Sequence, residues 1–162
     1  MNKNSADITV RSVKKEDVDT LVKYRLEYLT ELLGDAPAES KENLRKELTE
    51  YFTEAFGQGL FFAFIAEEIG VVVGFGAMVI KKIPGDFNKS VYLEGDILNM
   101  YTLPFARNRG VSSLILKRLI KEASERGISK ISLHTTKAGE KVYRKFGFDN
   151  PVYPVLELTD LP

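Results

Sequence analysis

The sequence predicts an α/β fold of the α+β kind, in which a mixed and mostly antiparallel sheet is flanked by about four helices. Three patterns predict it: helical spacing of apolar residues in the first third, two strand-like runs joined by a short turn in the middle, and a strand–helix–strand unit near the end. At 162 residues, of which 44% are hydrophobic, the chain is expected to form a single domain over residues 1–162.

Two helices are predicted after a short first strand. Apolar and polar residues alternate over residues 8–13, which is typical of a strand. Apolar residues then recur every three or four positions over 18–33, and a glycine follows, so this segment is predicted to be a helix. A loop with a proline is expected over 35–40, before a second helix whose apolar face runs over 44–57.

Three strands are predicted next. The continuous apolar run 60–66 indicates a strand buried on both faces in the middle of the sheet. The short segment that follows it suits a hairpin turn into a second strand over 71–80, in which Gly74 and Gly76 leave bare backbone on one face. After a polar loop, the third of these strands covers 91–103.

The last third of the chain reads as a crossover unit. An amphipathic helix over 111–127 leads into a strand over 128–134, which is expected to lie parallel to the strand before the helix. A short helix is predicted over 135–147. The segment 148–158 is strand-like in composition, although it contains two prolines.

Composition excludes several classes of function. Lysine plus arginine and aspartate plus glutamate both number 23, so no net positive field attracts nucleic acid, and no nucleic-acid partner is expected. The absence of cysteine excludes disulfides, thiolate metal sites and an acyl-cysteine intermediate, and no metal is expected. The polar start over 1–7 and the lack of an apolar run of roughly 20 residues predict a cytoplasmic protein without a membrane partner.

The basic turn at residues 107–110 (Arg-Asn-Arg-Gly) is the strongest candidate for a binding site. It lies between the end of a predicted strand and the start of a predicted helix, where backbone N–H groups lack partners and the helix dipole is positive. Ser112 and Ser113 add two hydroxyl groups to the first turn of that helix. The pattern suits a diphosphate, although a charged turn in solvent has the same composition.

Two motifs in this region resemble the GNAT acetyltransferase superfamily. Residues 107–112 (Arg-Asn-Arg-Gly-Val-Ser), after a strand that ends in 101–104, resemble the acetyl-CoA signature Arg/Gln-x-x-Gly-x-Gly/Ala, with Ser112 where Gly or Ala is usual. Residues 143–148 (Tyr-Arg-Lys-Phe-Gly-Phe) resemble the closing Tyr-x-x-x-Gly-Phe segment of the family. The order of the predicted elements over 8–158 also agrees with that family.

The resemblance implies how acetyl-CoA is bound. The sheet is expected to splay between its fourth and fifth strands, and pantetheine is expected to lie in the gap along the strand backbone. The diphosphate is expected to bind the N–H groups of the turn, where two arginine side chains are available to it. Thr136 stands where many relatives carry an asparagine that holds pantetheine. The implied cofactor-binding residues are Met100, Tyr101, Thr102, Arg107, Asn108, Arg109, Gly110, Val111, Ser112, Ser113, Thr136 and Tyr143.

The reaction implied is direct transfer of the acetyl group from acetyl-CoA to a primary amine in a ternary complex. Tyr143 occupies the position of the family's tyrosine and is predicted to protonate the leaving thiolate. One candidate for the base is His134, the only histidine, which can accept a proton at neutral pH or instead contact the acceptor. The other candidates are Glu94 and Asp96, which lie two positions apart in a region where many relatives place a glutamate. A solvated carboxylate is the alternative for the last two.

Two other functions remain open from the sequence. The fold and the acetyl-CoA site are compatible with a sensor or regulatory module that has no turnover. A nucleotide-binding protein of another class is less compatible, because neither a Gly-x-x-x-x-Gly-Lys-Ser/Thr loop nor a Gly-x-Gly-x-x-Gly segment is present. The sequence does not identify the amine acceptor, and a homodimer through the last strands is a possible assembly.

Overall fold

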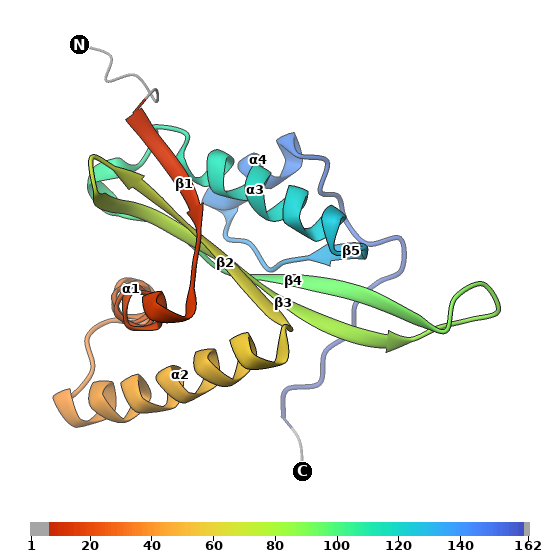
Figure 1. Ribbon diagram of the computed structural model, residues 1–162, viewed down its shortest axis with the longest axis horizontal. Helices are drawn as coiled ribbons and strands as arrows, with labels where there is room; N and C mark the ends of the chain where they lie inside the picture. The colour runs from red at the N-terminus through yellow and green to blue at the C-terminus, as the bar shows by residue number, and fades with distance from the viewer. Residues whose placement is uncertain (1–6, 161–162) are drawn as a thin grey trace.

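The computed structural model describes residues 7–160 and contains one five-stranded sheet (Figure 1). The strands lie in the order β1-β2-β3-β4-β5, so each strand pairs with its neighbours in the chain. Their bounds are β1 Ile8–Ser12, β2 Phe61–Glu68, β3 Val71–Pro84, β4 Val91–Thr102 and β5 Ile128–Ser132. The first four strands are antiparallel and β5 is parallel to β4, which confirms the predicted mixed sheet. Of the predicted polar start, residues 1–6 lie outside the described residues.

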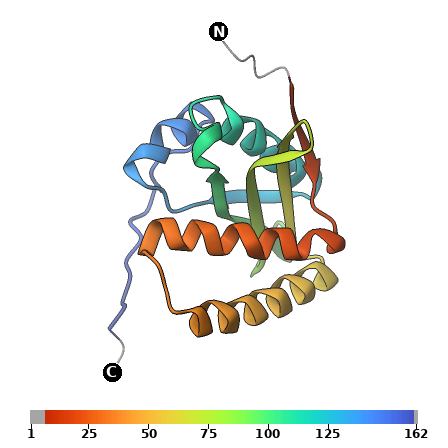
Figure 2. The same ribbon diagram turned by 90° about the vertical axis from the view of Figure 1, so that its left-hand side faces the viewer.

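Helices cover both faces of the sheet (Figure 2). Helices α1 and α2 pack on one face, around a core that includes Phe52, Ile65 and Phe75. Helices α3 and α4 lie on the other face, where Ile115 and Leu119 are fully buried. The bounds are α1 Val18–Leu33, α2 Ala38–Gln58, α3 Val111–Glu125 and α4 Lys137–Lys145. No helix in the described part of the chain is long and apolar enough to cross a membrane.

The two glycines of β3 allow α3 to approach the sheet closely. A Cβ on Gly74 would lie 2.8 Å from Val111 Cγ1 and 2.9 Å from the carbonyl oxygen of Tyr101, and a Cβ on Gly76 would lie 2.7 Å from Ile115 Cγ2. All of these separations are shorter than a normal carbon contact. The bare backbone predicted from the sequence therefore seats the helix that follows the basic turn.

The structure corrects three predicted boundaries. Residues 38–40, predicted as loop, form the start of helix α2, which begins at Ala38. Pro37 stands just before the first turn of the helix, where a missing N–H costs nothing. Strand β5 ends at Ser132 because its pairing with β4 ends there. The segment 148–158 is not a strand: its prolines lack N–H groups, and it pairs with no strand of the described chain.

Candidate active site

A cleft opens where β4 and β5 diverge. The last parallel pair is Asp96 with Ser132, whereas β4 continues to Thr102. Beyond Asp96, the edge of β4 that faces β5 has no strand partner among residues 7–160, which confirms the splay predicted between the fourth and fifth strands. A cavity of about 230 Å³ occupies the gap. It is lined by Tyr28, Ile97, Asn99, Met100, Thr102, Ser112, His134, Thr135, Thr136, Gly139, Val142 and Tyr143.

A β-bulge shapes the wall that β4 contributes to the cleft. Opposite Gly76 of β3, β4 has one residue more than its partner strand, so Asn99 and Met100 share that position. Asn99 has φ 57°, in the left-handed region that asparagine tolerates better than most residues. Its side-chain oxygen accepts a hydrogen bond from Arg25 of α1. The side chain of Asn99 therefore joins the bulge of β4 to α1.

The basic turn forms a concave array of unpaired N–H groups. Asn108 has φ 59° and Gly110 has φ 78°, and Gly110 is the N-cap residue of α3. The first backbone N–H of this helix that finds a partner is that of Leu114, which donates to the carbonyl of Gly110 at 3.1 Å. In the described part of the chain, the N–H groups from Asn108 to Ser113 have no acceptor. Free N–H groups at the positive end of a helix bind phosphate oxygens, so a diphosphate fits this turn.

The two arginine side chains of the turn are not directed at that array. Arg107 Nη2 lies 2.6 Å and 2.8 Å from the two carboxylate oxygens of Glu31, and its Nε donates to the carbonyl of Thr102 at 3.1 Å. Arg109 forms an ion pair with Glu68 of the β2–β3 hairpin, and its side chain is 18% exposed. Nearby carboxylates thus bind both guanidinium groups, and their contact with phosphate oxygens stays a prediction.

Tyr143 of α4 lies on the cleft with its ring against Phe148, the centroids being 5.8 Å apart. Burial, and to a lesser degree the phenol of Tyr28, raise the pKa of Tyr143 above its ordinary value. Its hydroxyl therefore keeps its proton at neutral pH and can donate it. Tyr101, by contrast, donates to Glu31 at 2.7 Å, and burial and this bond raise its pKa to about 12.

His134 and Thr136 lie between β5 and α4. Both line the cleft and both are exposed. The Thr136 hydroxyl is the N-cap of α4, accepting a hydrogen bond from Gly139 N at 3.2 Å, so its proton remains free for another acceptor. The chain leaves β5 at Ser132, which brings His134 into the cleft from a loop instead of from the predicted strand end.

Glu94 and Asp96 do not line the cleft, although they share a face of β4. Glu94 Oε1 lies 2.8 Å from Lys130 Nζ of β5, and Asp96 forms an ion pair with Lys81 of β3. Each carboxylate is thus matched by a neighbouring ammonium on an adjacent strand. Among the residues that the structure describes, no group of three potential metal ligands occurs.

Comparisons with known proteins agree with this geometry. Residues 26–148 match the family model described as acetyltransferase (GNAT) family. The chain belongs to the GNAT acetyltransferase family. A structure from Clostridium acetobutylicum, described as a predicted acetyltransferase with acetyl-CoA, has 34% sequence identity and a TM-score of 0.80, with 94% of this chain and 96% of that one covered.

More distant structures share the fold of this GNAT protein. A GCN5-related N-acetyltransferase from Ralstonia eutropha has 21% identity and a TM-score of 0.74, over 93% of this chain and 98% of that one. Glucosamine-6-phosphate N-acetyltransferase from Arabidopsis thaliana has 18% identity and a TM-score of 0.68, over 94% and 99% of the two chains. No curated protein matches the chain.

Sequence reasoning missed two residues of this site. Arg25 falls on the apolar stripe of α1, where a lone arginine is unusual, and this position could have marked it as a candidate functional residue. Asn99 gave no usable signal, because a bulge in mid-strand depends on the pairing of β3 with β4.

Proposed function

We propose that this protein is an N-acetyltransferase that transfers the acetyl group of acetyl-CoA directly to a primary amine in a ternary complex. The observation that carries the proposal is the run of free N–H groups from Asn108 to Ser113, next to a cleft that both Ser112 and Tyr143 line. The similar protein from Clostridium acetobutylicum, whose structure includes acetyl-CoA, supports the choice of co-substrate.

The free edge of β4 is the proposed site of pantetheine. An amide chain laid along Met100, Tyr101 and Thr102 can bond to their backbone as an added strand would. The carbonyl of Thr102 already accepts from Arg107, so the remaining groups of this edge would carry the contact. Acetyl-CoA supplies an acetyl thioester, whose carbonyl carbon is open to attack by an amine.

His134 is the base that we propose. The acceptor amine must lose a proton before its nitrogen can attack, because an alkylammonium has a pKa of about 10.4. His134 lines the cleft and is open to solvent, to which it can pass the proton. Glu94 is the weaker candidate, because it lies outside the cleft lining and is paired with Lys130.

Tyr143 is the proposed acid. As the new C–N bond forms, the attacking nitrogen loses its second proton to solvent. As the C–S bond breaks, the sulfur leaves with the electron pair and takes a proton from the Tyr143 hydroxyl. The raised pKa of Tyr143 keeps the hydroxyl protonated at neutral pH, so a proton is available when negative charge develops on the sulfur. Solvent can then return a proton to the phenolate.

Arg25 narrows the class of acceptor. It bonds to Asn99 and lies over the ring of Tyr28, two residues of the cleft, but it forms no ion pair with any carboxylate of the described residues. The Arg25 side chain is half-buried, and this burial lowers its pKa. We therefore propose an acceptor that carries a carboxylate or another anionic group near its amine.

One set of variants tests the proposed chemistry. Tyr143→Phe should lower kcat about 100-fold, the lower end of the usual contribution of an acid, with little change in the affinity for acetyl-CoA. His134→Gln should lower kcat most near neutral pH, where the acceptor amine still needs a base and a histidine can act as one. Glu94→Gln should leave kcat close to that of the parent. Tyr92→Phe serves as the matched control. It removes a tyrosine hydroxyl that bonds to Asp86, and Tyr92 does not line the cleft, so kcat should not change.

The acceptor is tested with pairs of amines that differ in one charge, an amino acid against its carboxamide. The parent should prefer the amino acid with the free carboxylate. Arg25→Gln should remove that preference by raising the KM of the carboxylate form about 10-fold or more, because a charge-assisted hydrogen bond contributes about 1.5–3 kcal/mol. If the parent used the amino acid and its carboxamide equally well, this would contradict the proposal of an anionic acceptor but not the proposal of an N-acetyltransferase. Tight binding of acetyl-CoA without turnover of any amine would contradict the enzyme and support the sensor.

A further inference from the structure

Helix α1 is tied to β4 at two points. It crosses the sheet (Figure 2) and carries Arg25, Tyr28 and Glu31, which recur every three positions and so are neighbours on its surface. Arg25 bonds to Asn99 in the bulge of β4. Two residues further along the strand, the Tyr101 hydroxyl donates to Glu31 Oε2 at 2.7 Å. The helix is therefore fixed to the strand that is proposed to hold pantetheine.

Glu31 also binds the turn that is proposed to receive the diphosphate. Arg107 Nη2 donates to both of its carboxylate oxygens, at 2.6 Å and 2.8 Å. The guanidinium carbon of Arg107 lies 5.8 Å from the centroid of the Tyr101 ring. One carboxylate thus joins α1, β4 and the turn, and we call Glu31, Tyr101 and Arg107 the Glu31 cluster.

The position of Glu31 is unusual for a carboxylate. It lies in the last turn of α1, where the helix dipole disfavours negative charge and no basic residue of the same turn compensates it. Bonds from Tyr101 and then from Arg107 lower the pKa of Glu31, so it is ionised at neutral pH. The Glu31 and Arg107 side chains are 44% and 42% exposed, and ion pairs as open as this contribute little to stability. The cluster is therefore better suited to hold the parts of the site in register than to stabilise the fold.

The Glu31 cluster reaches the acceptor side of the cleft. The rings of Tyr101 and Tyr28 meet edge to face, with centroids 5.6 Å apart, and the Arg25 guanidinium carbon lies 5.5 Å from the centroid of Tyr28. Tyr28 lines the cleft, and Arg25 is the residue proposed to bind the anionic group of the acceptor. Packed side chains of this kind can transmit a shift of Arg107 to both residues.

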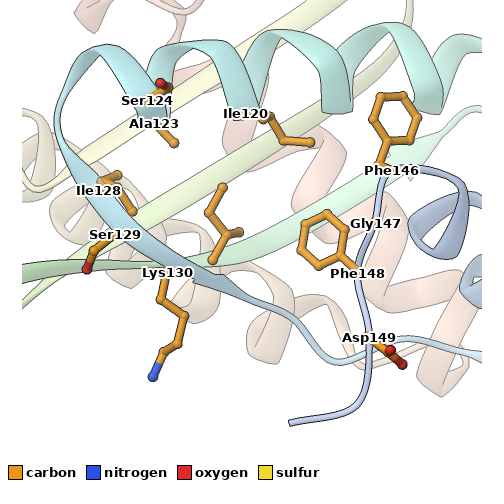
Figure 3. A pocket seen from close by; sticks show the side chains of 11 residues that line it. Ile120, Ala123, Ser124, Ile128, Ser129, Lys130, Phe146, Gly147, Phe148 and Asp149 are labelled. Carbon is orange, nitrogen blue, oxygen red and sulfur yellow. The ribbon is translucent and has the colours of Figure 1, made fainter. Parts of the chain in front are cut away.

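A larger hollow offers no such connection. A groove of about 440 Å³ lies between α3, β5 and residues 146–149 (Figure 3). Its two charged lining residues are already paired, Lys130 with Glu94 and Asp149 with Arg144, and α1 contributes nothing to its walls. Coupling between two ligands is therefore expected at the cleft, which α1 helps to line.

We propose that Glu31 is a positioning residue that couples the two substrate sites, so that binding of coenzyme A at the turn strengthens binding of the acceptor beside α1, and the reverse. The inference rests on the proposed function, because it takes the turn as the diphosphate site and α1 as the acceptor wall. Glu31 does not line the cleft and acts through Tyr101 and Arg107. Coupling between sites is reciprocal and usually changes affinity by about 5-fold to 150-fold.

Hydrogen exchange with coenzyme A as the only ligand tests the coupling. In the parent, saturating coenzyme A should slow exchange about 5-fold or more in the last two turns of α1, as well as in the first turn of α3. In Glu31→Ala, the slowing at α3 should remain and the slowing at α1 should be lost. Glu31→Gln keeps an oxygen that can accept from Tyr101 and Arg107, so it should recover part of the slowing at α1. Glu27→Gln, which changes an exposed carboxylate one turn earlier, should behave as the parent.

Kinetics with the amino acid described above test the acceptor side. Glu31→Ala should raise the KM of the amino acid about 5-fold or more and leave kcat close to that of the parent. A fall in kcat at unchanged KM would overturn the inference, as would equal slowing at α1 in Glu31→Ala and the parent, or no slowing at α1 in the parent. No slowing at α3 in the parent would contradict the acetyl-CoA site itself, and the coupling with it. Slowing at α1 that depends on Glu31, without turnover of any amine, would contradict only the proposed enzyme.

Discussion

Gly74 in β3 offers a direct test of how the sheet positions the acetyl-CoA site. In Gly74→Ala, the new methyl would meet Val111 Cγ1 at 2.8 Å and the carbonyl oxygen of Tyr101 at 2.9 Å. Neither atom can move aside easily, because valine is stiff at χ1 and the carbonyl belongs to the backbone of β4. Val111 is the first residue of α3 and Tyr101 lies on the strand proposed to hold pantetheine, so the clash acts on both halves of the site.

Overpacking of this kind costs about 1–3 kcal/mol of the free energy of unfolding. For a chain of this size each kcal/mol corresponds to a fall in Tm of about 2–4 °C, so a loss of about 2 kcal/mol lowers Tm by about 4–8 °C. The dissociation constant of coenzyme A should rise in the same variant, as α3 and β4 are forced apart. Urea denaturation and calorimetric titration measure the two effects.

Gly57→Ala is the matched control for this change. Gly57 lies within α2, and a Cβ there has no heavy atom within 4 Å. Alanine should therefore stabilise the protein by about 0.5–1 kcal/mol, because glycine is the poorer helix former, with no effect on coenzyme A binding. If Gly74→Ala matched or exceeded the stability of the parent, the close approach of α3 to the sheet would be refuted.

Three further predictions follow from individual residues. Gly110→Ala should destabilise the turn by about 1–2 kcal/mol because φ is 78°, and Gly110→Asn should recover much of the loss in urea denaturation. Hydrogen bonds from Arg11 lower the pKa of Asp17, so Asp17→Asn should cost about 0.5–1 kcal/mol at pH 7. This difference should begin to shrink as pH falls below about 4 and should vanish once pH is below the lowered pKa of the folded carboxyl; a constant difference would contradict the role of charge. Since the pKa of Tyr143 is raised, the alkaline loss of kcat should begin above pH of about 10, and a loss centred below that value would exclude this tyrosine as the acid.

Much of the fold could be predicted because it follows from local patterns. The spacing of apolar residues placed four helices and five strands, and the strand–helix–strand unit around α3 implied the parallel pair. The last segment could not be placed in this way. Its composition suits a strand, but a strand also needs a partner, and no pattern within residues 148–158 states whether one is present.

The candidate site divides along the same line. The sequence by itself predicted the basic glycine turn and the free N–H groups at the start of α3, because these depend on neighbours in the chain, and the resemblance to the family pointed to Tyr143. Only the tertiary structure decided that Glu31 and Glu68 bind the two arginines of the turn, and that Arg25 reaches Asn99. Those contacts join residues more than 40 positions apart, and the sheet brings them together after β2, β3 and β4 have paired.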